Sequence, residues 1–248
     1  LWTAGGTRER RLAQLAKLRI TTKPGVRREY SDVGMILLGA VLEEMTGRPL
    51  DTVIRERVLG PVGTHETAFN PLQHYAMYRI APTEYDTRSG MLIQGRVHDG
   101  NAAALAGVAG HAGLFRPARD LALLSASLLH AANGRDNPLF DGNWFAKTLD
   151  KRTFGRPLGW DAPTGNSSSG HYFSSESFGH TGFTGTSIWI DPERDVFVVL
   201  LTNRLNPSAS NQKHLALRRE VHDAVMLSLR EPAPVAVPLE LPAPAPEF

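Results

Sequence analysis

The feature that most constrains the fold is a pair of apolar segments in the last quarter of the chain. Residues 186–190 alternate between polar and apolar side chains, residues 191–195 are turn-forming, and residues 196–201 form a continuous apolar run. This pattern predicts an antiparallel β-hairpin with a buried second strand. Because a two-stranded hairpin is marginally stable alone, the fold has to add further strands or a covering helix.

Helices are expected to provide that cover. The first 24 residues place leucines at helical spacing between basic side chains, which is typical of a surface helix. Ser31 offers an N-cap ahead of an almost wholly apolar run that Gly47 ends, so this helix is expected to be buried. Further amphipathic helices are predicted over residues 117–134 and 211–230.

Composition narrows the class of protein. The 248 residues carry a formal charge of +2 and no cysteine, which excludes a disulfide scaffold and cysteine-type structural zinc. A charge so near zero gives no electrostatic case for a nucleic-acid partner. The longest apolar run is far below the ~18 residues that a membrane-spanning helix needs. We therefore expect neither a nucleic-acid partner nor an integral membrane segment.

The chain divides into four expected segments. A basic helix or linker occupies residues 1–24, and a helical lobe with cleft loops occupies residues 25–150. Sheet strands and a helix occupy residues 155–230, and a proline-rich tail that cannot build a core occupies residues 231–248. Within the lobe, residues 63–113 show little periodicity, and a loop region of that length is often functional.

Tyr30, Ser31 and Asp32 lie where a loop meets the apolar helix. A tyrosine there can project into a cleft, and it can act as a general base if a nearby cation lowers its pKa. Taken alone, these three residues fit better a plain helix cap by Ser31 or Asp32, with Tyr30 packed beside it.

A glycine-rich segment, His180-Thr181-Gly182-Phe183-Thr184-Gly185, comes directly before the hairpin. Glycines let a backbone approach a ligand closely, and N–H groups at such a position can bind a developing oxyanion. His180 would add a hydrogen-bond donor. A glycine-rich turn that leads into an edge strand fits the same residues.

The two triplets together carry a resemblance. A Tyr-Ser-Asp at a helix start, followed about 150 residues later by a His-Thr-Gly before a β-hairpin, resembles the serine hydrolases of the penicillin-recognising fold. The similarity is to class C β-lactamases, family VIII carboxylesterases and related D-aminopeptidases, and it covers about residues 20–230. Supporting phrases of the β-lactamase-related branch lie at residues 97–99, 107–115 and 187–192.

The resemblance implies an α/β (α+β) fold of the β-lactamase/transpeptidase type, with helices flanking an antiparallel sheet beside a helical lobe. It implies hydrolysis of an ester, amide or β-lactam bond in a small molecule through an acyl-serine intermediate, without a metal or organic cofactor. Tyr30 would be the general base, and the Phe183 N–H would complete the oxyanion hole. The substrate would be bound by Asp32, His180, Thr181 and Gly182.

Two positions depart from the family's pattern. Asp32 stands in place of the usual asparagine and puts an acceptor-only carboxylate where an amide would donate to the substrate. His180 stands in place of the usual lysine, as in many esterase-like members. These departures favour ester or amide substrates over penicillins.

The family's third element, a Ser-x-x-Lys nucleophile ahead of the tyrosine triplet, has no counterpart here. The sequence's single match, Ser210 to Lys213, lies after the hairpin and fits a chance occurrence. We therefore expect the chain to be the C-terminal portion of a hydrolase, lacking its N-terminal third, and inactive by itself. Two alternatives stay open: a pseudoenzyme that keeps the cleft for binding, and an interaction module.

Four further residues are expected to support the cleft, with His98 and Asp99 ordering a loop that lines it. The four are Ser31, His98, Asp99 and His111. No His-Glu-x-x-His or similar spacing occurs, so we expect no metal site.

Missing sheet strands would leave the hairpin edge unpaired, which predicts self-association through that edge. The sequence leaves the cellular compartment open, and the resemblance favours the periplasm or export.

Overall fold

A computed structural model describes residues 5–87, 89–140, 142–165, 167–206 and 209–229. The proline-rich tail expected over residues 231–248 lies outside the described residues.

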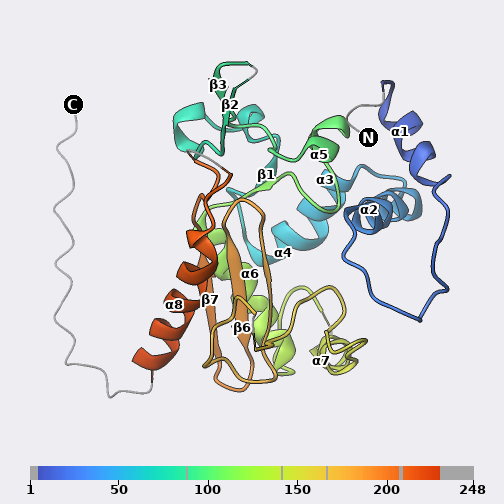
Figure 1. The fold of residues 1–248 in the computed structure, drawn as a ribbon. Coiled ribbons are helices and arrows are strands. Elements are labelled where there is room, and N and C mark those ends of the chain that lie inside the picture. Colours follow the sequence, from blue (N-terminus) through green and yellow to red (C-terminus); the bar gives the residue numbers. More distant parts are fainter. Residues whose placement is uncertain (1–4, 88, 141, 166, 207–208, 230–248) are drawn as a thin grey trace.

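A three-stranded antiparallel sheet forms one half of the molecule (Figure 1). Its strands are β5 (Phe178–Thr181), β6 (Ser187–Asp191) and β7 (Val196–Leu200), in the order β5-β6-β7. The predicted hairpin is β6 paired with β7 and is confirmed. The third strand, β5, carries part of the glycine-rich segment into the sheet, where His180 lies opposite Ile188. Self-association through a sheet edge stays a prediction.

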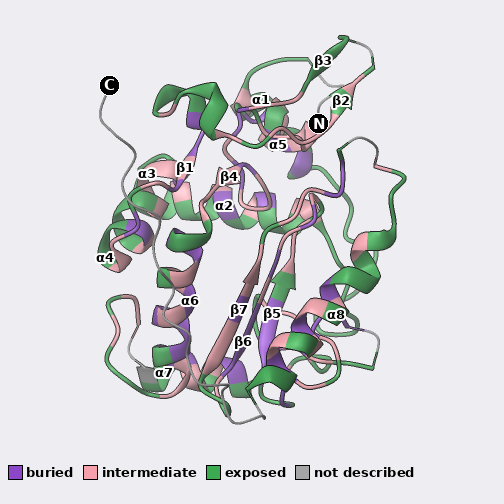
Figure 2. Ribbon diagram, turned by 90° about the vertical axis from the view of Figure 1, so that its left-hand side faces the viewer, coloured by how far each residue is buried: buried purple, intermediate pink, exposed green. Residues whose placement is uncertain are grey.

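Helices cover both faces of this sheet (Figure 2). α6 (Ala118–Ala132) and α7 (Gly142–Asp150) lie on one face, and α8 (Lys213–Ser228) lies on the other. Side chains alternate along β6, so that Ile190 packs toward α6 and Trp189 packs toward Met226 of α8. Both strand residues are fully buried.

The other half consists mainly of helices. They are α1 (Arg8–Leu15), α2 (Asp32–Thr46), α3 (Leu50–Ile54), a π-helical turn (Arg55–Leu59), α4 (Gly60–Val62) and α5 (Gly100–Ala104). Leu15, Ile36 and Leu105 belong to the small buried cluster that joins α1, α2 and the α5 region. No helix in the described part of the chain combines the length and apolar character needed to cross a bilayer.

The expectation that the apolar helix is buried on many sides is wrong. α2 buries Ile36 and Gly39, whereas Leu38 is 51% exposed and Met45 is 77% exposed. The reason is geometric: the neighbouring elements that pack on α2 cover one side of it, and its remaining apolar side chains face outward.

Two pairs of very short strands lie within the region of weak periodicity. β1 (Ala68–Phe69) pairs with β4 (Leu114–Phe115), and β2 (Tyr85–Asp86) pairs with β3 (Met91–Leu92). Two short 3-10 turns (Pro71–Gln73 and Met77–Arg79) connect the first pair to the second. Strands of two residues leave no alternation to detect in the sequence.

Candidate active site

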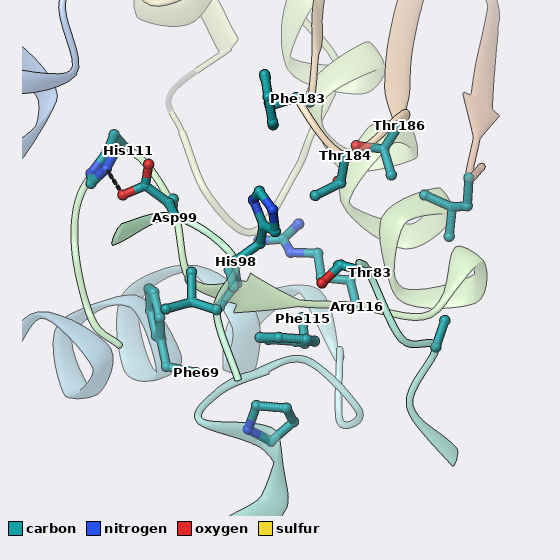
Figure 3. Close-up of a pocket in the computed structure, with 18 of the residues that line it drawn as sticks. Phe69, Thr83, His98, Asp99, His111, Phe115, Arg116, Phe183, Thr184 and Thr186 are labelled. Atoms are coloured by element: carbon teal, nitrogen blue, oxygen red, sulfur yellow. Dashed lines mark hydrogen bonds and ion pairs between the residues drawn. The ribbon is translucent and has the colours of Figure 1, made fainter. Parts of the chain in front are cut away.

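A cleft of about 1080 Å³ lies where the two halves meet. The sheet half contributes residues 180–184 and 201–203, and the helical half contributes Tyr30, Asp32 and residues 109–117 (Figure 3). The floor includes Phe69 and Phe115, which give the cleft an apolar base below its polar walls.

Tyr30 and His180, the first residues of the two predicted triplets, meet in this cleft. Their rings stack with centroids 6.4 Å apart and planes 22° apart. Ser31 caps α2, since its Oγ accepts a hydrogen bond from the Gly34 N–H at 3.2 Å. Tyr30 is 75% exposed and therefore does not pack beneath the helix it precedes. The cap and the cleft-facing tyrosine coexist.

The His180–Gly182 triplet has a defined hydrogen-bond pattern. The Nδ1 of His180 lies 2.9 Å from the carbonyl oxygen of Thr181. Because a carbonyl only accepts, Nδ1 carries the proton, and in the neutral ring Nε2 is the acceptor. A Cβ on Gly182 would lie 2.2 Å from the Thr186 hydroxyl, so a larger residue here would require the Thr186 side chain to move.

Phe183 is held at the edge of the cleft by its ring and its carbonyl. The Arg204 guanidinium lies 4.2 Å from the ring centroid, and Arg204 Nε donates to the Phe183 carbonyl at 2.6 Å. The His98 ring stacks on the Phe183 ring at 5.9 Å. Among the described residues the Phe183 N–H has no hydrogen-bond acceptor, so it is available to a ligand.

His98 is anchored by Glu84, a residue of the 63–113 region that the sequence did not mark individually. Its Nε2 lies 2.7 Å from Glu84 Oε2. A carboxylate can only accept, so this nitrogen carries a proton. The Glu84 contact and the Phe183 ring fix the imidazole between the two walls of the cleft.

Asp99 and His111 form a hydrogen-bonded pair close to Asp32. Asp99 caps α5 by accepting from the Ala102 N–H at 2.7 Å, and it also accepts from His111 Nε2 at 2.8 Å. Burial alone raises the pKa of Asp99, but the Ala102 N–H and the His111 imidazole outweigh it, so the pKa falls below its usual value.

Gly110 lets this pair approach α2. A Cβ at position 110 would lie 2.1 Å from the Met35 carbonyl oxygen, which is backbone and cannot rotate away. A glycine at this position therefore brings the 107–113 loop against the first turns of α2, and with it His111 against Asp32.

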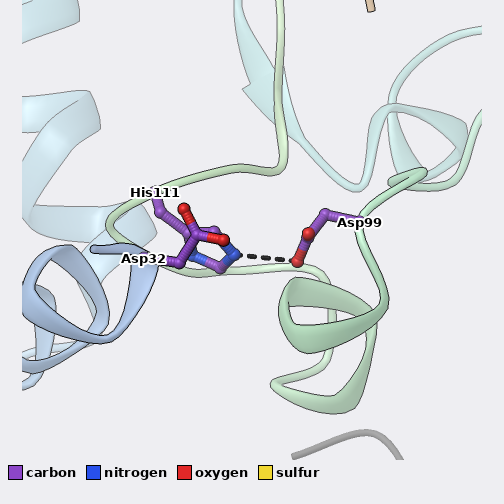
Figure 4. Close-up of side chains that lie close together, drawn as sticks. All are labelled: Asp32, Asp99 and His111. Atoms are coloured by element: carbon purple, nitrogen blue, oxygen red, sulfur yellow. Dashed lines mark hydrogen bonds and ion pairs between the residues drawn. The ribbon is translucent and has the colours of Figure 1, made fainter. Parts of the chain in front are cut away.

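Asp32, Asp99 and His111 each offer a ligand-type atom within 4.8 Å of the other two (Figure 4). Carboxylate oxygens and imidazole nitrogens are ligands for several divalent metals. The three residues come from separate segments, so motif spacing could not reveal the group. The His111–Asp99 hydrogen bond already accounts for two of its members, and His111 Nδ1 is buried with no partner among the described residues.

The cleft's described lining contains no serine and no lysine. Ser210 and Lys213, the one match to a Ser-x-x-Lys pattern, precede or begin α8 and are not among the lining residues. The described cleft thus brings together Tyr30 and His180 without a serine or a lysine in its lining.

Comparison with known proteins identifies the family. The family model described as Beta-lactamase matches residues 1–223. This chain belongs to the beta-lactamase family. The predicted resemblance is confirmed.

Two curated relatives show how the beta-lactamase-family chain compares in length. It is 35% identical over 225 residues to the "Putative D-alanyl-D-alanine carboxypeptidase" of Escherichia coli (strain K12), covering 82% of this chain and 51% of that protein. It is 35% identical over 217 residues to the N-acetylmuramyl-L-alanine amidase of Bacillus subtilis (strain 168), covering 79% and 49%. The chain thus spans about half the length of the curated relatives it matches.

A solved structure confirms the predicted fold. A beta-lactamase from Mycobacterium bovis superposes with a TM-score of 0.60 at 23% identity, covering 90% of this chain and 74% of that one. The β-lactamase/transpeptidase-like arrangement, an antiparallel sheet flanked by helices, is therefore the fold of this chain.

Sequence reasoning missed three residues around the cleft: Glu84, Arg116 and Arg204. Arg116 follows directly on the 107–115 phrase that was singled out, so its neighbourhood was marked although the residue was not. Glu84 contacts His98, and Arg204 contacts Phe183. These are tertiary contacts, which the local sequence does not indicate.

Proposed function

We propose that this chain forms the base-bearing and substrate-binding walls of a serine hydrolase that cleaves ester or amide bonds through an acyl-serine intermediate. The observation that carries the proposal is the stacking of Tyr30 on His180 at 6.4 Å inside a shared cleft. The two residues are 150 positions apart in the sequence. A helix cap and an edge-strand turn with no joint function would have no reason to meet there.

Tyr30 is proposed as the general base. Its phenol is the exposed end of a side chain whose ring rests on His180, so the hydroxyl is free to contact a serine hydroxyl and the leaving group. As the phenolate, it would take the serine proton during acylation and return that proton to the leaving group. Proton transfer of this kind contributes roughly 10²–10⁴-fold in rate.

The Phe183 N–H is proposed as one oxyanion donor. It lies next to Gly182 on the turn after β5 and has no acceptor among the described residues. Arg204 holds the Phe183 carbonyl and ring, which fixes the direction of the adjacent peptide. A preorganised donor of this kind stabilises the tetrahedral intermediate by about 3 kcal/mol.

Asp32, His180, Thr181 and Gly182 are proposed to bind the substrate. Asp32 can only accept when ionised, and the His180 ring, whose Nδ1 donates to the Thr181 carbonyl, can present Nε2 as an acceptor, so this wall suits substrates with N–H or O–H donors. The names of the two curated relatives, a carboxypeptidase and an amidase, favour an amide over an ester.

We also propose that the 248-residue chain does not form the acyl-enzyme by itself. The described cleft lining holds neither a serine nor a lysine, so Tyr30 has no hydroxyl to activate there. The nucleophile would come from outside these residues.

The test is acylation by a fluorophosphonate, read by intact mass, on the 248-residue chain and on the product of its complete reading frame. We expect no adduct on the chain and a single adduct on a longer product that supplies the serine. In that product Tyr30→Phe should slow acylation at least about a hundredfold. Tyr78→Phe, at a phenol that is 86% exposed outside the cleft, is the matched control and should not change the rate.

An adduct on the 248-residue chain would overturn the proposal of an incompetent chain. The absence of an adduct on both products would favour the second candidate, a binding cleft without hydrolysis. The observation that keeps this candidate open is the same lack of serine and lysine in the described lining.

A further inference from the structure

Arg116 is a cation of the cleft with no hydrogen-bond or ion-pair partner among the described residues. Its side chain extends into the cleft, between β4 and the N-terminus of α6 (Figure 3). In the part of the chain that the structure describes, its guanidinium makes no hydrogen bond and no ion pair. The nearest named negative charge is Asp120, whose carboxylate already accepts from the Glu66 N–H at 2.9 Å and from the Thr67 hydroxyl at 2.7 Å.

The other described arginines around the cleft are engaged. Arg79 is paired with Glu66. Arg204 donates to the carbonyls of Phe183 and Ala209. Arg116 therefore differs from its neighbours in having donors that no described acceptor satisfies.

The Arg116 side chain is also partly shielded from solvent. Arg116 lies above Phe115 in a partly buried position, and burial lowers its pKa to about 10, with Asp120 acting in the opposite direction. A guanidinium whose donors no described acceptor satisfies is available to a ligand, and a planar carboxylate that accepts two parallel hydrogen bonds matches its donors best.

We propose that Arg116 binds a carboxylate group of the ligand that occupies this cleft, at a position separate from the His180–Gly182 triplet. If this ligand is the substrate of the proposed hydrolase, the substrate carries a carboxylate apart from the bond that is cleaved. Asp32 and Arg116 both line the cleft, so one ligand can contact an acidic and a basic side chain at the same time.

The probe is hexanoate, a carboxylate with an apolar tail suited to Phe69 and Phe115, and its neutral control is hexanamide. Binding to the 248-residue chain is followed by NMR at the arginine Nε–H groups. We expect hexanoate to move one arginine resonance, which is lost in Arg116→Gln, and to bind at least about tenfold more weakly to that variant. Arg119→Gln, an exposed arginine three residues along, is the matched control and should leave binding unchanged.

Arg116→Lys keeps the charge but not the bidentate geometry, and it should weaken hexanoate binding by an intermediate amount. It also serves as the test variant if the glutamine variant does not fold. Equal hexanoate affinity in the wild type and in both Arg116 variants would overturn the proposal, as would hexanamide binding as tightly as hexanoate or no hexanoate binding at all.

The assay needs no nucleophile, so its outcome is independent of the acylation test. Hexanoate binding through Arg116 with no acylation in either product would support this site and refute the hydrolase. Acylation without Arg116-dependent hexanoate binding would support the hydrolase and refute the Arg116 site.

Discussion

The sheet half and the α2 half of this protein bury their apolar side chains to different extents. The sheet lies between α6 and α8, so Trp189 and Ile190, on opposite faces of one strand, are both fully buried. α2 is covered on one side, and Leu38 and Met45 stay exposed at 51% and 77%. The difference shows that an almost wholly apolar helix is buried on every side only where the fold places neighbouring elements against every side.

The cleft lies on the boundary between these halves, and its two walls differ in how firmly they are held. The wall with His180 and Phe183 continues directly from β5, whose pairing with β6 fixes it. The opposite wall holds Tyr30 and Asp32 through a few contacts, chiefly the close approach at Gly110 and the Asp99–His111 pair. We expect substitutions in the first half to change global stability and substitutions in the second to change the cleft.

The largest effect should come from the centre of the sheet half. Trp189→Ala removes a fully buried indole that packs on Phe173 and donates to Ser168 Oγ at 3.0 Å. It should lower the free energy of unfolding by about 3–5 kcal/mol in urea titrations. Met45→Ala on α2 is the contrast and should change it by less than about 0.5 kcal/mol. Similar losses in the two variants would mean that the halves do not differ in burial as described.

The next effect tests the point where the loop meets α2. Gly110→Ala puts a Cβ where the Met35 carbonyl oxygen lies 2.1 Å away, so the loop has to move. We expect a loss of about 1–3 kcal/mol, as for overpacking in a core, and a changed chemical shift of the His111 ring. Gly165→Ala, where a Cβ would meet nothing within 4 Å, is the control. An unshifted His111 signal would show that Gly110 does not position the pair.

A smaller effect is expected at the cap of α5. Asp99→Ala removes the acceptor of the Ala102 N–H and of His111, and should cost about 0.5–2 kcal/mol. Asp99→Asn keeps a capping oxygen but not the charge facing His111, so it separates the two roles. If the asparagine variant is as destabilised as the alanine variant, the pair with His111 matters more than the cap. Asp136→Asn, at an exposed aspartate, controls for loss of charge alone.

These differences also explain what the sequence could and could not predict. The hairpin and the helix of Leu121, Leu124 and Leu128 were predictable because their side chains repeat with the period of the structure they form. β5 was missed as a separate strand because it is four residues long and contains a glycine and a histidine. The short strands of the 63–113 region have no period at all.

For the cleft, residue type and order were enough to select Tyr30 and His180, which do meet. They were not enough to select Arg116, whose significance lies in the absence of a partner among the described residues, a property of three-dimensional surroundings. The exposure of α2 was unpredictable for the same reason, since a helix's sequence does not state which neighbours will cover it.

The smallest expected effect returns to the sheet half and is a dependence on pH. His222 on α8 is fully buried, and its Nδ1 donates to the Ser168 carbonyl at 2.6 Å. Burial lowers its pKa from 6.5, Arg218 lowers it further, and the Ser168 contact and Asp223 oppose them.

Because the folded pKa of His222 lies below the unfolded one, the unfolded chain binds more protons as the pH falls below about 6.5. Stability contributed by the neutral ring is therefore full above that pH and is lost on acidification, with a slope of at most about 1.4 kcal/mol per pH unit for one proton. His222→Asn can still donate to the Ser168 carbonyl but cannot titrate. Urea unfolding between about pH 5 and pH 8 should show a shallower slope for this variant than for the wild type. His65→Asn, at an exposed histidine, should keep the wild-type slope, and equal slopes in all three proteins would place the pH dependence outside the sheet half.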